Sequence, residues 1–254
     1  MTRESAQQGN QGSSGNSNDR DMIVERVVGV RADGLELDYD LPEAATADER
    51  AGNWQFPARI FKPSSGPAQL LNGPELAARV DAWLKAVGWP RTICGHWIFT
   101  WDAFRIECDP QSVIETVASF DLRSADVREG APFQVSDASR PGTLARKAAG
   151  PDGATFSVEM PVDPDAVRRA RAKSDVVTGE IMNKPVTLEA ALRERAKQAV
   201  SGTISVEFET DSDGNVRRRT KVTKLNIEGP DGLAETDTVT ETLERRLISR
   251  ALSP

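Results

Sequence analysis

A ten-residue phrase that occurs twice constrains the fold of this chain more than any other feature of its sequence. Residues 33–42 read DGLELDYDLP, and residues 152–161 read DGATFSVEMP, 119 residues further on. Each copy opens with Asp-Gly, alternates apolar and polar residues, and closes on Pro. This pattern predicts a hairpin turn that leads into a strand with one buried face. We therefore expect two similar halves, each built on an antiparallel hairpin.

The patterns after each copy of the phrase follow a common order of hairpin, short helix, strand, longer helix and second hairpin. In the first half, residues 47–54 and 76–87 indicate helices, with a strand at 55–61 between them. In the second half, residues 176–182 indicate a strand and 188–196 a helix. The predicted fold class is α+β, a mostly antiparallel sheet with packed helices, in two similar ββαβαββ-like halves.

Composition divides the chain into four predicted parts. Residues 1–21 are Ser, Gly, Asn and Gln in low-complexity order, which predicts a disordered tail. Residues 22–122 form the N-terminal α+β half, and residues 123–141, which lack periodicity, form a linker. The C-terminal α+β half, residues 142–254, contains a β-meander whose Thr-rich last strand, 234–248, has an exposed edge.

The net charge of the chain, −7, excludes one class of partner. Nucleic acid needs clustered cations to neutralise its phosphates, so we expect no nucleic-acid partner. No apolar run approaches the roughly 18–20 residues that span a bilayer, so we expect no transmembrane segment. The absence of a signal peptide makes the cytoplasm the default location. A periplasmic or secreted location is the alternative, if a leader is missing and the two cysteines are bridged.

Both cysteines lie in residues 94–108, CGHWIFTWDAFRIEC. If this segment folds back around Trp101, Cys94 faces Cys108 and a cross-strand disulfide becomes possible. If it is one continuous strand, the two cysteines lie more than about 40 Å apart and are free thiols in the core. The residues at the turn, 100–103, include no Gly or Asn and so disfavour a hairpin. Both interpretations remain open, and a disulfide would imply an oxidising compartment.

The sequence contains no complete metal or nucleophile site. Structural zinc takes four ligands, whereas the chain has two cysteines and one histidine. Cys94 and His96 lie about 6–7 Å apart on a strand, which is too far for a hydrogen bond. Residues 211–215, DSDGN, begin like a calcium loop but lack its Gly and Glu further on, which predicts a hairpin turn. We predict no catalytic residue, no metal and no cofactor.

The candidate interaction surface combines aromatic and basic residues. Trp97 and Trp101 lie in the cysteine-containing segment, and Arg217 and Arg219 lie in the meander. These side chains could hold an anionic or apolar partner. The alternative is an ordinary solvated face, because basic runs commonly offset nearby carboxylates.

The meander carries a local resemblance to a known family. Residues 196–216, AKQAVSGTISVEFETDSDGNV, are similar to the helix–hairpin segment of TonB C-terminal domains. The resemblance covers this stretch alone. Residues 229–248 form a turn and a Thr-rich strand where that family has a helix and a tryptophan-containing strand, so we do not assign the chain to it. A change of apolar parity between Val222 and Leu225 predicts a bulge in the strand that returns from the hairpin.

These observations favour a non-enzymatic binding or interaction module, with a bacterial cell envelope as one fitting location. Its expected partner is a protein or a small apolar ligand. The first alternative is a carboxylate-dependent hydrolase that uses Glu36, Asp38, Asp40 and Asp102. The second is a homo-oligomeric structural protein that pairs through the edge of residues 234–248.

Overall fold

The computed structural model describes residues 1–9, 14–99, 103–123 and 126–247. These residues form two compact units. The inserted unit is Asp21–Asp121, and the split unit is Met1–Arg20 together with Leu122–Pro254. The chain contains both helices and strands, and every strand pair in the described ranges is antiparallel. The predicted α+β class with mostly antiparallel sheet is therefore confirmed.

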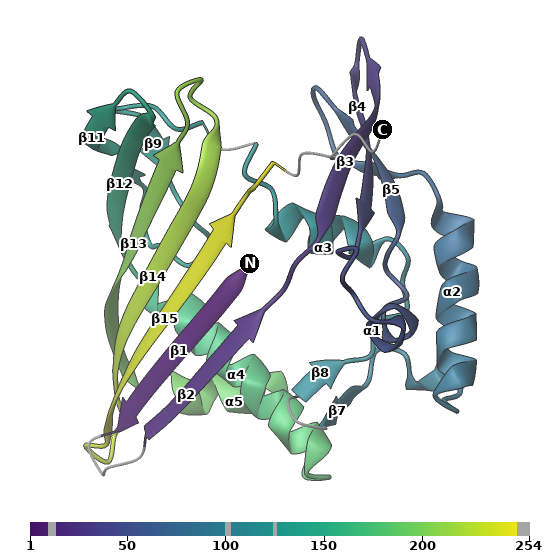
Figure 1. Ribbon diagram of the computed structural model, residues 1–254. Coiled ribbons are helices and arrows are strands. Elements are labelled where there is room, and N and C mark those ends of the chain that lie inside the picture. The colour runs from purple at the N-terminus through teal and green to yellow at the C-terminus, as the bar shows by residue number, and fades with distance from the viewer. Residues whose placement is uncertain (10–13, 100–102, 124–125, 248–254) are drawn as a thin grey trace. The chain divides into compact units, whose positions relative to one another are not determined.

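The split unit is built on a seven-stranded sheet with the order β11-β12-β13-β14-β15-β1-β2 (Figure 1). Its strands are β11 (Ala145–Gly150), β12 (Gly153–Pro161), β13 (Ala199–Thr210), β14 (Val216–Glu228), β15 (Ala234–Glu244), β1 (Thr2–Gly9) and β2 (Ser14–Arg20). Two helices, α4 (Pro164–Ile181) and α5 (Leu188–Arg195), lie against one face of this sheet (Figure 1). A small sheet pairs β9 (Pro132–Phe133) with β10 (Gly142–Thr143).

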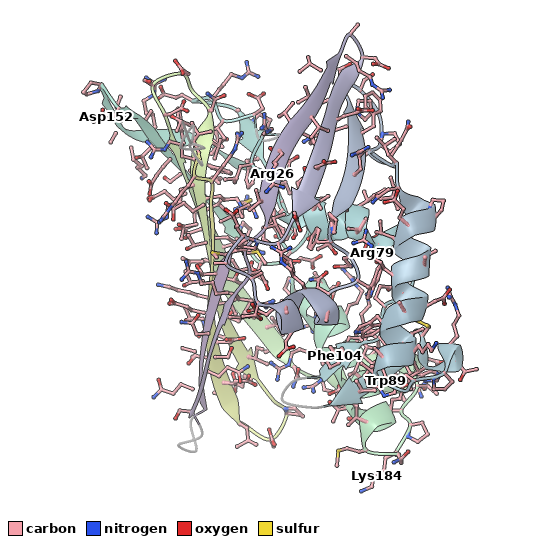
Figure 2. The ribbon with its side chains drawn as sticks, turned by 45° about the vertical axis from the view of Figure 1, so that its right-hand side comes forward. Arg26, Arg79, Trp89, Phe104, Asp152 and Lys184 are labelled. Carbon is pink, nitrogen blue, oxygen red and sulfur yellow. A yellow bond between two sulfur atoms is a disulfide. The ribbon has the colours of Figure 1, made fainter. Side chains whose placement is uncertain are left out.

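The core of the split unit contains the apolar face of the second repeated phrase. Its buried side chains on β12 and β13 face one another as register partners: Phe156 with Phe208, Val158 with Val206, and Met160 with Ile204. The ring of Phe133 packs edge-on against Phe208, with centroids 5.2 Å apart. Asp152 lies at the tip of the β11–β12 hairpin, as predicted for the Asp-Gly turn (Figure 2).

The inserted unit has a four-stranded sheet with the order β3-β4-β5-β6. Its elements are β3 (Val24–Arg31), β4 (Gly34–Asp40), α1 (Ala47–Gly52), β5 (Ala58–Pro63), β6 (Gln69–Leu70), α2 (Gly73–Ala86), the 3₁₀ turn η1 (Arg91–Ile93), β7 (Trp97–Phe99), β8 (Ala103–Arg105) and α3 (Ser112–Ser119). Leu37 and Tyr39 of the first repeated phrase are buried in its core with Leu76 and Val80 of α2. No helix in the described ranges is long and apolar enough to cross a bilayer.

The glycine of each repeated Asp-Gly pair lies against the backbone of another strand. A Cβ atom at Gly34 would overlap the carbonyl oxygen of Lys62 on β5. A Cβ atom at Gly153 would overlap that of Thr210 on β13, and Gly153 also has a φ of +135°. Only glycine fits such positions, which gives the repeated phrase a physical basis in both units.

The N-terminal residues differ from the disordered tail predicted for 1–21. Strand β1 pairs with β15 over eight register positions, and β2 pairs with β1. A polar segment can form strands here because the backbone of β15 offers it hydrogen-bonding groups along a whole edge. The edge predicted to be exposed on residues 234–248 is consequently covered by β1.

Two further predictions for the second half are corrected. Residues 176–182 do not form a strand, because residues up to Ile181 belong to α4. Val176 and Val177 favour a strand by local propensity, but a helix that begins at Pro164 continues through them. The two halves therefore do not share one element order. The predicted linker, 123–141, lies within the split unit, where Asp137 forms an ion pair with Lys221.

Candidate anion-binding site

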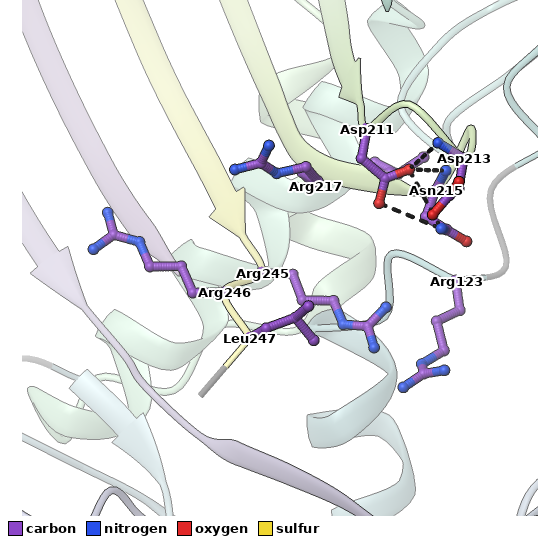
Figure 3. A pocket seen from close by; sticks show the side chains of 9 residues that line it. Arg123, Asp211, Asp213, Asn215, Arg217, Arg245, Arg246 and Leu247 are labelled. Carbon is purple, nitrogen blue, oxygen red and sulfur yellow. Dashed lines mark hydrogen bonds between the residues drawn. The ribbon is translucent and has the colours of Figure 1, made fainter. Parts of the chain in front are cut away.

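A pocket of about 700 Å³ lies in the split unit, where the β13–β14 turn approaches the end of β15 (Figure 3). It is lined by Arg123, Asp211, Asp213, Asn215, Val216, Arg217, Arg245, Arg246 and Leu247. The lining includes four arginines and two aspartates, which together carry a formal charge of +2. This local charge is opposite in sign to that of the whole chain, −7.

The β13–β14 turn, which forms one wall of the pocket, is held together by Asp211. Its Oδ1 accepts hydrogen bonds from the backbone N–H groups of Asp213 at 3.0 Å and Asn215 at 2.8 Å, and from the Asn215 side chain at 3.3 Å. The hydrogen bond from the Asn215 backbone is the largest influence on the pKa of Asp211, which lies below its ordinary value. Asp211 is therefore ionised and engaged by its own turn, as the predicted hairpin turn requires.

A β-bulge after this turn places Arg217 at the pocket. Thr210 is opposite Val216, whereas the preceding residue, Glu209, is opposite Arg218, so Arg217 is the extra residue on β14. A bulge directs its extra side chain away from the regular alternation of the strand. The bulge predicted between Val222 and Leu225 is wrong in position, because the register is continuous there.

The arginines of the pocket differ in what they contact. Arg246 forms a two-pronged ion pair with Glu244, at 2.9 and 3.0 Å, which lowers the pKa of that carboxyl group. The charge of Arg217 also contributes to the lowered pKa values of Asp211 and Glu244. Yet within the described ranges the exposed guanidinium of Arg217 makes no hydrogen bond or ion pair. Its donors are available to an external acceptor.

The neighbouring arginines of β14 do not line the pocket. Arg218 is exposed and forms an ion pair of 3.5 Å with Glu209 on β13. Arg219 is half-buried and lies opposite Phe208 and Leu243 in the register. Of the two arginines in the predicted interaction surface, only Arg217 lies at the pocket.

The tryptophans of that predicted surface belong to the other unit. Trp97 is half-buried on β7 of the inserted unit. Trp101 lies outside the described residues. Three further arginines of the pocket were not predicted: Arg123, which lies in a segment without periodicity, and Arg245 and Arg246, which follow the end of β15. Only the adjacent Arg245-Arg246 pair, after the Thr-rich strand, was a visible signal for them.

Cys94 and Cys108 form a disulfide in the inserted unit, with Cα atoms 5.6 Å apart. The segment between them folds back, so that Ile98 of β7 faces Phe104 of β8. Cys108 is buried and contributes to the core of the unit. The structure therefore follows the fold-back alternative, despite the weak turn residues.

Three of the four carboxylates proposed for hydrolysis lie on β4, and each of them is ion-paired. Glu36 pairs with Arg31, Asp38 with Arg59 at 3.0 Å, and Asp40 with Arg50 at 3.2 Å and Arg26 at 3.9 Å. Asp102 lies outside the described residues. Within the described ranges, no group of three or more His, Cys, Asp or Glu side chains could hold a metal ion.

A second charged cluster lies on the helix-covered face of the split unit. Arg171 of α4 pairs with Glu235 of β15 at 2.8 Å. Asp237, two residues along β15, has a buried Oδ1 that accepts no hydrogen bond from any residue the structure describes. Burial raises the pKa of Asp237 above its ordinary value, although a hydrogen bond with Gln7 of β1 opposes the rise.

Comparison with known proteins does not identify a family. No protein-family model matches the sequence. No curated protein shows significant similarity to it. A crystal structure of a conserved protein of unknown function with a hot dog fold, from Alicyclobacillus acidocaldarius, aligns at 11% identity over 98% of this chain and 79% of that chain, with a TM-score of 0.12. That score is too low to support any statement about fold.

Proposed function

We propose that this protein is a non-enzymatic binding module that holds an anionic group of its partner in the arginine-lined pocket of the split unit. The observation that carries this proposal is Arg217, which a bulge places at the pocket with its donors unused by the described residues. A guanidinium presents a planar fork that matches carboxylate and phosphate oxygens.

The lining residues support binding rather than catalysis. They include no serine, cysteine or histidine that could act as a nucleophile or base. One of the two carboxylates, Asp211, is engaged by its own turn. The four arginines of the lining are hydrogen-bond donors, which suit recognition of an oxyanion. A mostly charged lining also favours an anionic ligand over the small apolar ligand expected from sequence.

The charge distribution supports a compact anionic partner. An acidic protein repels anions in general, but a local cationic concavity concentrates them at one place. A pocket of about 700 Å³ favours a phosphate- or carboxylate-bearing small molecule or side chain. The disulfide supports an oxidising compartment, so we place this module in a cell envelope or outside the cell.

Titration calorimetry with inorganic phosphate, and separately with citrate, tests the proposal at constant ionic strength. We expect Arg217→Ala to weaken binding about tenfold or more, because a charged hydrogen bond contributes about 1.5–3 kcal/mol. Arg218→Ala is the matched control, since Arg218 is the next residue but contacts Glu209 outside the pocket. It should bind as the unchanged protein does.

If both variants weaken anion binding equally, the effect is one of general charge and contradicts the pocket assignment. If the unchanged protein binds neither phosphate nor citrate, the pocket assignment is also contradicted. Comparison of the phosphate and citrate arms separates the two oxyanion types. Ligands recovered chemically unchanged after long incubation would support a binding role over an enzymatic one.

A further inference from the structure

The β1–β2 hairpin of the split unit covers β15, but none of its side chains whose burial is described belongs to the apolar core. Apart from Met1 and Ala6, residues 1–20 are polar or glycine. None of the hairpin side chains whose burial is described is buried. The strongest source of folding free energy, removal of apolar surface from water, is therefore almost absent from this element.

The hairpin is held on β15 mainly by backbone pairing. The register runs from Thr2 opposite Thr242 to Gly9 opposite Glu235. Three side-chain contacts add to it: an ion pair of 4.0 Å between Arg3 and Glu241, a hydrogen bond of 3.3 Å from the Thr236 hydroxyl to the carbonyl of Gln8, and a hydrogen bond between the side chains of Gln7 and Asp237. These contacts specify the register, but they join exposed or half-buried polar groups, and such contacts stabilise a structure little.

The covalent connection of the hairpin does not tie it to this sheet. Strand β2 ends at Arg20, and β3 of the inserted unit begins at Val24. The chain returns to the split unit only at Leu122. Along the chain, the whole inserted unit therefore lies between the hairpin and β15. No short loop keeps the hairpin next to β15 once their backbone pairing is broken.

We propose that the β1–β2 hairpin exchanges between copies of this chain, and that the edge of β15 is the interface at which a second copy docks its own hairpin. A hairpin from a second copy brings the same backbone groups, the same Arg3 and the same register. Exchange in both directions gives a closed, two-fold dimer in which every pair of the monomer is kept. This inference does not depend on the anion pocket.

Cross-linking between two variants, each with one added cysteine, tests the exchange. Ala6 and Thr238 are register partners on β1 and β15, so Ala6→Cys and Thr238→Cys place two thiols within disulfide reach. The two variants are purified separately, with the native disulfide intact, then mixed, equilibrated and oxidised. A cross-link between the two different chains forms only if the hairpin of one lies on β15 of the other.

We expect this mixed dimer to form and, at low occupancy, its fraction to rise about tenfold for a tenfold increase in protein concentration. The matched control mixes Ala6→Cys with Lys224→Cys. Lys224 is the register partner of Thr238 on β14, so it lies one strand further from β1 and outside disulfide reach. This control should give only background cross-linking.

The double variant Ala6→Cys/Thr238→Cys completes the design. If it cross-links only within one chain, and the mixed dimer never exceeds the Lys224→Cys control, the hairpin does not exchange and the proposal is overturned. If the double variant forms no cross-link at all, β1 does not pair with β15, and the proposal fails at its first step.

Discussion

Asp211 and Asn215 close the turn that carries the candidate site. The carboxylate of Asp211 accepts hydrogen bonds from both the backbone N–H and the side-chain amide of Asn215. Two residues further on, the bulge places Arg217 at the pocket. The geometry of the anion site therefore depends on a carboxylate that need not touch the ligand, and this relationship can be tested directly.

Asp211→Ala should weaken phosphate binding several-fold, because the turn loses its main acceptor and Arg217 loses its fixed position. Asp211→Asn keeps a side-chain acceptor and should retain more of the affinity.

The pKa of Asp211 is lowered, so its stabilisation of the turn is complete above its ordinary pKa of 3.8 and is lost as the pH falls through the folded value. The amide shift of Asn215 in a pH titration by NMR measures this loss; a shift that is independent of pH would contradict it.

Asp237→Asn should stabilise the protein at neutral pH. The pKa of Asp237 is raised, so the folded state binds the proton more tightly than the unfolded state, and stability declines as the pH rises through the interval above the ordinary value of 3.8. The advantage of the variant should vanish below that value. Urea denaturation across this pH range measures it. Glu235→Gln is the contrasting control, because it breaks the ion pair with Arg171 and should destabilise. A less stable Asp237→Asn variant at neutral pH would refute the prediction.

Gly153→Ala should destabilise the split unit by about 2–6 kcal/mol, because it combines an unfavourable φ with overlap at the Thr210 backbone. Gly150→Ala, across the same hairpin, is the matched control, since a Cβ atom there has no neighbour within 4 Å. Circular dichroism during urea unfolding reports on the sheet. All five tryptophans lie between residues 54 and 101, so fluorescence reports on the inserted unit and should not change. Equal losses in the two variants would show that the close approach at Gly153 is unimportant.

Replacement of Cys94 and Cys108 by serine should destabilise the inserted unit by about 2–4 kcal/mol, because the unfolded chain regains the freedom of the closed loop. The tryptophan fluorescence transition should move to lower urea concentration. Phosphate binding in the split unit should be unaffected. Thiol titration of the unfolded, unreduced protein should detect no free thiol; two free thiols per chain would rule out the disulfide.

Much of the fold follows from local sequence because several elements are specified by neighbouring residues. The capping box between Thr46 and Glu49 starts α1 at the predicted position. The alternation of the second repeated phrase places Phe156, Val158 and Met160 in the core. The capping box depends on residues three positions apart, and the strand alternation depends on residues two positions apart. The spacing of residues in the sequence is therefore sufficient to predict both.

Other features depend on partners that are remote in sequence. Nothing in the composition of residues 1–20 indicates strands, since the stabilising groups are on β15, more than 200 residues away. The same holds for the pocket, where Arg123 meets arginines from the far end of the chain.

By itself, the sequence determined the class of the fold, the two Asp-Gly hairpins and the Asp211 turn, because short-range hydrogen bonds and burial periodicity specify them. The tertiary structure alone decided that Cys94 meets Cys108, that the N-terminal segment covers β15, and that Arg217 and not Arg219 lines the pocket. The physical reason is that the partners of backbone groups and charges are set by chain topology. In addition, a single inserted residue in β14 reverses the direction of a side chain, and the apolar–polar pattern of the sequence does not show it.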